Sequence, residues 1–258
     1  MESCDFLSLL KEQGHLPADP LPAPVHGAGF NTTEGTTILA VRYREGVLIA
    51  GDRRATMGNM VVYDRADKVL SIDDDAVMAL AGSPAMAYEM ARLLEVSFQH
   101  YRRSQLQVLS LDGKLRILSR LLRDNLALAL QGIGAVVPIF ATYDTNIDAG
   151  KIFFYDVLGA QFESVDFCTT GSGSPIIRGA LYHHDRWQER LAEMDESASL
   201  ELVLKMLETA AEFDTATGGL NPRARIFPQV RRITAAGIET VAEDVLESIY
   251  HSELQPQS

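Results

Sequence analysis

A pair of threonines at residues 36–37, preceded by Gly35 and followed at once by an apolar run to Ala40, marks the junction of two unlike parts of the chain. If the chain is cut before Thr36, that residue carries both a hydroxyl nucleophile and an α-amine that can act as its base. The amine has an ordinary pKa of about 8, so a useful neutral fraction exists near neutral pH without any histidine. This stretch therefore indicates hydrolytic chemistry by a terminal threonine.

Two charged residues could assist such a nucleophile. Asp52 follows an apolar strand, and Lys68 begins the next predicted hairpin. Each residue by itself is more often a solvated strand end. An apolar sheet interior desolvates a lysine unless a carboxylate pairs with it, and Asp52 is the natural candidate. A cation beside the Thr36 hydroxyl would stabilise the negative charge that develops during attack.

Two further stretches offer hydrogen-bonding groups. Gly82 lies where a strand passes into a helix, so its N–H could bind an anion with support from the helix dipole. An ordinary strand-to-helix turn is the alternative. Asp214 and Thr217, about one turn apart at the end of a predicted helix, could present an acceptor and a hydroxyl on one face. A routine helix stop at the glycines 218–219 is the alternative.

The first 35 residues differ from the rest of the chain. Residues 5–14 can form one or two helical turns, and prolines at 17, 20, 22 and 24 then exclude a regular hydrogen-bonded element. The acidic start lacks the basic and apolar regions of a secretory signal. We predict an appendage over 1–35 and one domain over 36–258, with an ordinary disordered tail as the alternative for the appendage.

From residue 37 onward, short apolar runs alternate with segments of helical spacing. Strands are predicted at 38–41, 47–50, 68–72, 76–80, 136–143, 151–156, 161–167, 230–234 and 238–241. Helices are predicted from 83 to about 101 and at about 110–131, 174–187, 198–212 and 243–251. This order predicts an α+β fold with two stacked antiparallel sheets, each covered by a helix pair, in a four-layer α-β-β-α sandwich.

Composition excludes several classes of function. The formal net charge is −12 and no basic stripe is present, which disfavours nucleic acid as a partner. The two cysteines, Cys4 and Cys168, lie on opposite sides of the predicted cut, which fits a reducing compartment. No apolar run is long enough to cross a membrane. We therefore expect a cytoplasmic protein that binds neither nucleic acid nor membrane.

Competing motifs are weak. His183, His184 and Asp185 are contiguous, so on a helix they point in different directions and suit no single metal site. The Gly-Ser-Gly-Ser stretch at 171–174 lacks a glycine of the dinucleotide fingerprint, and no Gly-x-Ser-x-Gly elbow occurs. We therefore expect neither a metal nor an organic cofactor.

Taken in order, the motifs resemble those of a proteasome β subunit, most closely the actinobacterial type. The resemblance spans about residues 35–241 and rests on Gly35-Thr36-Thr37-Ile38, Gly51-Asp52-Arg53-Arg54-Ala55-Thr56 with Gly58-Asn59, Lys68, Ala81-Gly82, Gly171-Ser172-Gly173-Ser174 and Asp214-x-x-Thr217-Gly218-Gly219. It implies the N-terminal-nucleophile hydrolase fold, which agrees with the predicted layer order.

The resemblance also assigns roles. It implies that autolysis at the Gly35–Thr36 bond removes a propeptide, residues 1–35, and leaves Thr36 as the catalytic nucleophile. Asp52 and Lys68 match the charge pair beside the threonine, and Gly82 matches the oxyanion N–H. The groups that hold the threonine amine and its water match Ser172, Asp214 and Thr217, the last of which is often serine in the family.

By the same mapping, Thr56 hydrogen-bonds the substrate backbone. The pocket for the residue before the cut is shaped by small or apolar side chains, those of Ala55, Ala66, Leu70, Leu80 and Pro84. Because none of these side chains is charged, we expect cleavage after apolar residues.

The resemblance implies a threonine endopeptidase subunit of a bacterial proteasome core particle that degrades unfolded proteins. Its implied partners are α subunits, further copies in seven-membered β rings stacked face to face, and an unfolding ATPase that acts through the α rings. A non-catalytic ring subunit is one alternative, against which Thr36, Asp52 and Lys68 are all present. A subunit of the related bacterial two-component ATP-dependent peptidase is another, and the long leader fits it less well.

Overall fold

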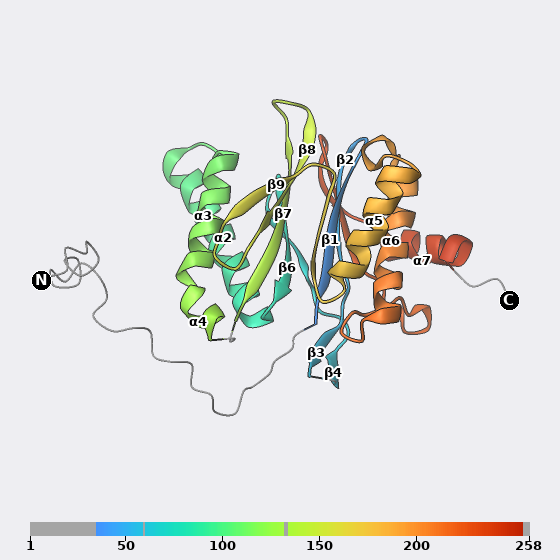
Figure 1. Ribbon diagram of the computed structural model, residues 1–258. Coiled ribbons are helices and arrows are strands. Elements are labelled where there is room, and N and C mark those ends of the chain that lie inside the picture. Colours follow the sequence, from blue (N-terminus) through green and yellow to red (C-terminus); the bar gives the residue numbers. More distant parts are fainter. Residues whose placement is uncertain (1–34, 59, 132–133, 255–258) are drawn as a thin grey trace, which may run out of the picture. The chain divides into compact units, whose positions relative to one another are not determined.

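Two antiparallel sheets form the centre of the structure, a computed structural model that describes residues 35–58, 60–131 and 134–254 (Figure 1). The strand order of the first sheet is β10 (Phe167–Gly171), β1 (Thr37–Tyr43), β2 (Gly46–Gly51), β11 (Gln229–Thr234) and β12 (Gly237–Thr240). The order of the second is β5 (Val69–Asp73), β6 (Ala76–Gly82), β7 (Val136–Asp144), β8 (Ala149–Tyr155) and β9 (Gln161–Ser164).

Helices cover the outer face of each sheet. Figure 1 shows the helices α2 (Pro84–Gln105) and α3 (Leu111–Asp124) beside the second sheet, and α5 (Ser174–Trp187) and α6 (Glu196–Phe213) beside the first. The short helices α4 (Leu126–Leu130) and α7 (Glu243–Ile249) follow α3 and β12. Two sheets between two helix layers form the predicted four-layer sandwich, which is confirmed.

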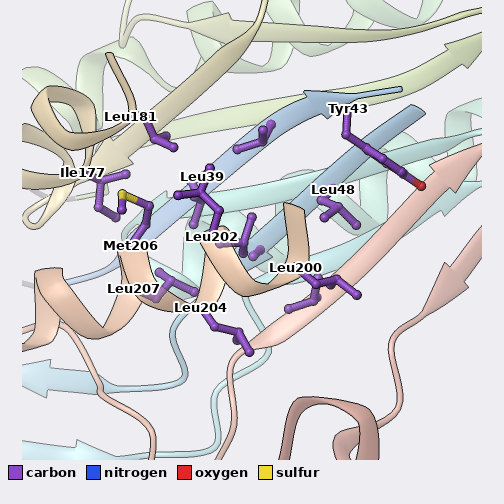
Figure 2. Close-up of a cluster of buried hydrophobic side chains, with 14 of the residues drawn as sticks. Leu39, Tyr43, Leu48, Ile177, Leu181, Leu200, Leu202, Leu204, Met206 and Leu207 are labelled. Carbon is purple, nitrogen blue, oxygen red and sulfur yellow. The ribbon is translucent and has the colours of Figure 1, made fainter. Parts of the chain in front are cut away.

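Strand β1 shows why a continuous apolar run is needed in the central strands. Successive side chains of a strand point to opposite faces. Leu39 and Val41 therefore pack against α5 and α6, in the cluster shown in Figure 2, whereas Ile38 and Ala40 pack between the two sheets. Both faces are covered, so an alternation of apolar and polar residues would leave a polar group in one of the two cores.

Local signals fix the start of two helices as predicted. Ser83 and Gly173 are the N-cap residues of α2 and α5, and each is followed within two residues by a proline, Pro84 or Pro175. Proline suits the first turn because its fixed φ is already helical and its missing N–H would have no helical partner there. The Ser83 side chain itself makes no capping hydrogen bond.

Two of the predicted elements are wrong in extent. The helix expected over 110–131 is interrupted at Asn125, whose side-chain amide donates to the Gly134 carbonyl. The strand expected over 161–167 is two strands, β9 and β10, which belong to different sheets. A two-residue break at Val165 and Asp166 carries the chain from one sheet to the other.

One element was not predicted. A two-stranded hairpin, β3 (Ala55–Met57) with β4 (Met60–Tyr63), leaves the end of β2 and belongs to neither large sheet. All four residues of β4 are exposed, although they are apolar or aromatic. The helical turns expected within residues 5–14 lie outside the described residues. None of the helices in the described part of the chain is both long and apolar enough to cross a membrane.

Candidate active site

The residues for which the sequence predicts a catalytic role lie at the ends of strands and helices. Thr36 directly precedes β1, Asp52 follows β2 and Lys68 precedes β5. Within the first sheet, β1 pairs on one side with β10 and on the other with β2, so that Thr37 lies opposite Gly171 and Ile38 lies opposite Gly51. This register brings the residues that follow β10 and β2 to the two sides of the Thr36–Thr37 peptide.

Backbone hydrogen bonds fix this arrangement. The Ser172 N–H donates to the Thr36 carbonyl at 3.0 Å, and the Asp52 N–H donates to the Thr37 carbonyl at 3.1 Å. Gly171 has a φ of 101°, and a Cβ at this position would lie 1.7 Å from the Thr36 carbonyl oxygen. Only glycine allows the backbone to approach the threonine so closely.

The Asp52 carboxylate is fully buried and accepts four hydrogen bonds. One oxygen, Oδ1, accepts from the Thr37 N–H at 2.8 Å and from the Lys68 ammonium at 2.7 Å. The other, Oδ2, accepts from the backbone N–H groups of Arg54 at 2.9 Å and Gly218 at 2.8 Å. A buried carboxylate is tolerated because donors from four segments satisfy it.

The ammonium of Lys68 is the cation of the site, and this residue is only 5% exposed. Besides Asp52, it donates to the Arg54 carbonyl at 2.5 Å. Burial lowers the pKa of Lys68 below its ordinary value, because desolvation disfavours the charged form, while the Asp52 carboxylate opposes this shift. The structure contains the predicted ion pair between Asp52 and Lys68. Lys68 lines the cavity that also holds Thr36, and Asp52 is buried behind it.

A chain of hydroxyl groups occupies the other side of the threonine pair. Asp214 accepts from Ser172 at 2.6 Å and from Thr217 at 2.5 Å. Because the Thr217 hydrogen is given to Asp214, the Thr37 hydroxyl, 2.6 Å away, donates to Thr217 Oγ1. The Thr37 hydroxyl in turn accepts from the Gly173 N–H at 2.9 Å. The sequence-predicted residues Ser172, Asp214 and Thr217 are thus brought together.

The chain of hydroxyls acts on the charge of Asp214. Burial raises the pKa of this carboxyl, but the hydrogen bonds from Ser172, Thr217 and the Ala216 N–H, together with the charge of Arg54, outweigh burial and hold the pKa below its ordinary value. Asp214 is therefore a stable anion near neutral pH. An anion here can hold a positively charged group close to Thr36.

A cavity of about 250 Å³ opens beside Thr36. Its wall is mostly apolar, and Lys68 and Gly82 also line it. It includes five of the six predicted substrate-binding residues: Ala55, Thr56, Ala66, Leu80 and Pro84. Leu70 does not line this cavity; it lies on a neighbouring one. The sequence did not indicate five other residues of the wall, namely Met57, Val62, Asp67, Ala87 and Tyr88. Asp67 is a carboxylate, and it pairs with Arg53 at 3.1 Å.

The bond before Thr36 lies in this cavity as well. The Gly35 N–H donates to the Thr56 hydroxyl at 3.2 Å. A Cβ on Gly35 would lie 1.8 Å from Cβ of Ala216, so no larger residue fits there. Gly82, with a φ of 108°, is similarly restricted, because its Cβ would lie 2.0 Å from the Ala135 carbonyl oxygen.

In the hydrogen-bond network of the site, the sequence reasoning also missed two residues, Thr37 and Arg54. Thr37 joins the hydroxyl chain and its N–H binds Asp52. Arg54 donates from Nη1 to the carbonyls of Thr215 and Thr217, each at 3.0 Å, and so ties the loop after α6 to the end of β2. The only sequence signal for either is its adjacency to a singled-out residue. Among the described residues, no three His, Cys, Asp or Glu side chains are placed to hold a metal ion.

Comparison with known proteins identifies the family. The proteasome subunit family matches residues 32–221. The chain is 44% identical to "Proteasome subunit beta 2" of Thermomonospora curvata over 218 residues, which cover 84% of this chain and 76% of the relative. The chain belongs to the proteasome subunit family.

Two other relatives agree. A proteasome subunit beta of Streptomyces griseus is 38% identical over 98% of this chain and 88% of its own length. A proteasome subunit beta of Acidothermus cellulolyticus is 40% identical over 89% of this chain and 78% of its own length. All three relatives are β subunits from actinobacteria, the type that the motifs indicate. Membership of the family implies assembly into proteasome core particles.

The four hydrogen bonds that the buried Asp52 carboxylate accepts lead to a testable prediction. We expect Asp52→Asn to lower the free energy of unfolding by about 3–5 kcal/mol, because the amide nitrogen cannot accept a hydrogen bond and Lys68 loses its counter-ion. Urea denaturation of the subunit measures the loss.

Asp166→Asn provides the matched control. Asp166 pairs with Arg42 at 3.0 Å near the surface, where both side chains are partly exposed. This change should cost less than about 1 kcal/mol. An equal loss in both variants would show that the buried carboxylate holds no special place in the fold.

Proposed function

We propose that this chain is a threonine endopeptidase subunit of a bacterial proteasome core particle, in which Thr36 is the nucleophile. The observation that carries the proposal is that Thr36 and Lys68 line one mostly apolar cavity, with the Lys68 ammonium paired to the buried Asp52 carboxylate. A buried cation beside a hydroxyl favours the negative charge that appears during attack on a carbonyl. The apolar wall offers a place for a substrate side chain.

The precursor must first be cut. In the uncut chain the Thr36 nitrogen is an amide and cannot act as a base. Attack of the Thr36 hydroxyl oxygen on the Gly35 carbonyl carbon forms a five-membered ring. The hydroxyl proton passes to the Thr36 nitrogen, and rupture of the C–N bond then gives an ester and a free amine. Water hydrolyses the ester, which releases residues 1–35 and restores the hydroxyl. The Thr56 hydroxyl, which accepts from the Gly35 N–H, holds the residue before the cut.

The mature enzyme then uses the new amine. The amine takes the Thr36 hydroxyl proton, directly or through a water, while the oxygen attacks the substrate carbonyl. Lys68 stays charged and stabilises the attacking oxygen, and the Gly82 N–H stabilises the oxyanion. The amine returns the proton to the leaving nitrogen as the C–N bond breaks, and water hydrolyses the ester. Ser172, Asp214 and Thr217 hold the amine, because Asp214 is an anion.

The partners and the compartment follow from the proposal. The subunit would form seven-membered β rings stacked face to face, with α subunits outside and an unfolding ATPase reached through them, in the cytoplasm, and would digest unfolded proteins. The names of the three relatives favour a proteasome over the two-component peptidase. The buried charge pair favours a catalytic over a structural subunit.

The nucleophile is tested by Thr36→Ala. We expect assembled particles to lose peptidase activity by more than about a thousandfold and to retain residues 1–35 by intact-mass measurement. Thr36→Ser, which keeps a hydroxyl, should still release the leader. The proposal fails if wild-type particles begin at Met1 and still digest peptides, or if the alanine variant is fully active.

Gly35 generates a second prediction. Gly35→Ala should leave the leader attached, because the new methyl group overlaps Ala216 and displaces the carbonyl that Thr36 must attack. Mass spectrometry of particles at successive times after assembly measures the uncut fraction. Gly179→Ala, in helix α5, is the control, since no atom lies within 4 Å of a Cβ at that glycine and its φ is not positive. Cutting at the wild-type rate in the Gly35 variant would contradict the geometry.

The cavity wall generates a third prediction. Fluorogenic peptides with leucine, phenylalanine or alanine before the cut should be cleaved faster than peptides with lysine or glutamate, by roughly tenfold or more, since a charge gains little from a mostly apolar wall. The one carboxylate of the wall, Asp67, is already paired with Arg53. The measurement is kcat/KM across the panel. Faster cleavage after a charged residue would contradict this assignment.

A further inference from the structure

The edge strand β5 of the second sheet is held by polar side chains from the first sheet. β5 has a neighbour on one side only, β6. Gln229 and Arg231, two residues apart on β11, contact it. Arg231 donates from Nε to the Val69 carbonyl at 3.2 Å and from Nη1 to the Ser71 hydroxyl at 2.6 Å. These hydrogen bonds join β11 of the first sheet to β5 of the second.

Gln229 lies closest to the charge pair. Its side-chain oxygen accepts from the Lys68 N–H at 2.7 Å and from the Val69 N–H at 3.0 Å. Its own backbone lies opposite Gly51, the residue before Asp52, in the register of β11 and β2. One residue therefore fixes the backbone at both members of the Asp52–Lys68 pair, which come from different sheets.

We infer that Gln229 is a positioning residue that holds the Lys68 ammonium on Asp52 and at Thr36, by anchoring the Lys68 backbone to the strand next to Asp52. The inference rests on the proposed function for its kinetic consequences, and Gln229 lies beyond the residues 32–221 that the family matches. Apart from Gln229, Arg231 and the Asp52–Lys68 pair itself, the described sheets meet near this point through apolar side chains such as Ile49 and Val69. Apolar contacts are not directional, so they resist a small sliding of one sheet past the other less than a hydrogen bond does.

The charged groups around Lys68 determine how its pKa changes if its ammonium is displaced. The charged groups that act on it are Asp52 and Arg54 after β2 and Asp214 after α6. Burial lowers the pKa of Lys68, and Asp52 opposes this shift. If Lys68 moves away from Asp52, its pKa falls further and the ammonium loses its proton at a lower pH. The alkaline limb of the rate profile would then move to lower pH.

The test compares Gln229→Met with Gln229→Glu in assembled particles. Methionine keeps the length of the side chain but removes the acceptor, and glutamate keeps an acceptor oxygen. We expect Gln229→Met to lower kcat by about tenfold to a hundredfold with KM changed less than about threefold, because a small displacement of a catalytic group is costly. Its alkaline limb should move to lower pH. Gln229→Glu should retain most of kcat, and its alkaline limb should move to higher pH because of the added negative charge.

Arg231→Met is the matched control within the same line of contacts. It removes the hydrogen bonds from Arg231 to the Val69 carbonyl and the Ser71 hydroxyl. It leaves the hydrogen bonds that Gln229 accepts from the Lys68 and Val69 N–H groups. We expect it to lower the melting temperature without moving the alkaline limb. The inference is overturned if both methionine variants lower kcat in proportion to their melting temperatures, since Gln229 would then be merely structural.

A crystal structure of Gln229→Met separates this inference from the proposed function. The Lys68 Nζ to Asp52 Oδ1 distance, 2.7 Å in the wild type, should lengthen in the variant and return in Gln229→Glu. An unchanged distance overturns the positioning role. If wild-type particles have no activity that Thr36→Ala removes, the proposed peptidase fails, and the distance in the variant still decides the role of Gln229.

Discussion

The buried carboxylate of Asp52 is the constraint on which the site depends. It has no contact with solvent and is satisfied by donors at the start of β1, at its own turn, before β5 and in the loop after α6. Loss of a partner from a buried charge costs several kcal/mol, a large share of the stability of a typical domain. Each of the four segments is therefore fixed at Asp52 by a hydrogen bond that is costly to lose.

The sandwich can supply such a site only where its elements end. Within the central strands, the sheet ladders use most of the backbone groups, and the side chains fill three apolar clusters. Beyond the last residues of β2, β6, β10 and α6, backbone N–H groups are free to bind other groups, and glycines allow close approach. The apolar layers fix these ends relative to one another, and the polar groups at the ends determine what the cavity can do.

Sequence reasoning predicted the features that local physics determines. Apolar runs such as 38–41 specify a strand buried on both faces, and Ser83-Pro84 specifies a helix start. Asp52 and Lys68 could be singled out because a charge at the end of such a run needs a partner. The roles of Thr37 and Gln229 could not be predicted, because hydroxyl and amide side chains are common and only the pairing of β1 with β10 and of β11 with β2 gives these two a function. The β3–β4 hairpin was not predicted, although Met60–Tyr63 is an apolar run; in the structure this run is exposed and belongs to none of the three apolar clusters.

The tight contact of Gly35 with Ala216 also bears on the order of events during synthesis. Ala216, against which Gly35 lies, is added by the ribosome long after the threonine pair. If the chain cuts itself as proposed, the scissile carbonyl is not positioned until that late loop has folded onto the early strand. Release of the leader would then require that the C-terminal half of the chain has folded. An incomplete or misfolded subunit would keep its leader and would have no free threonine amine.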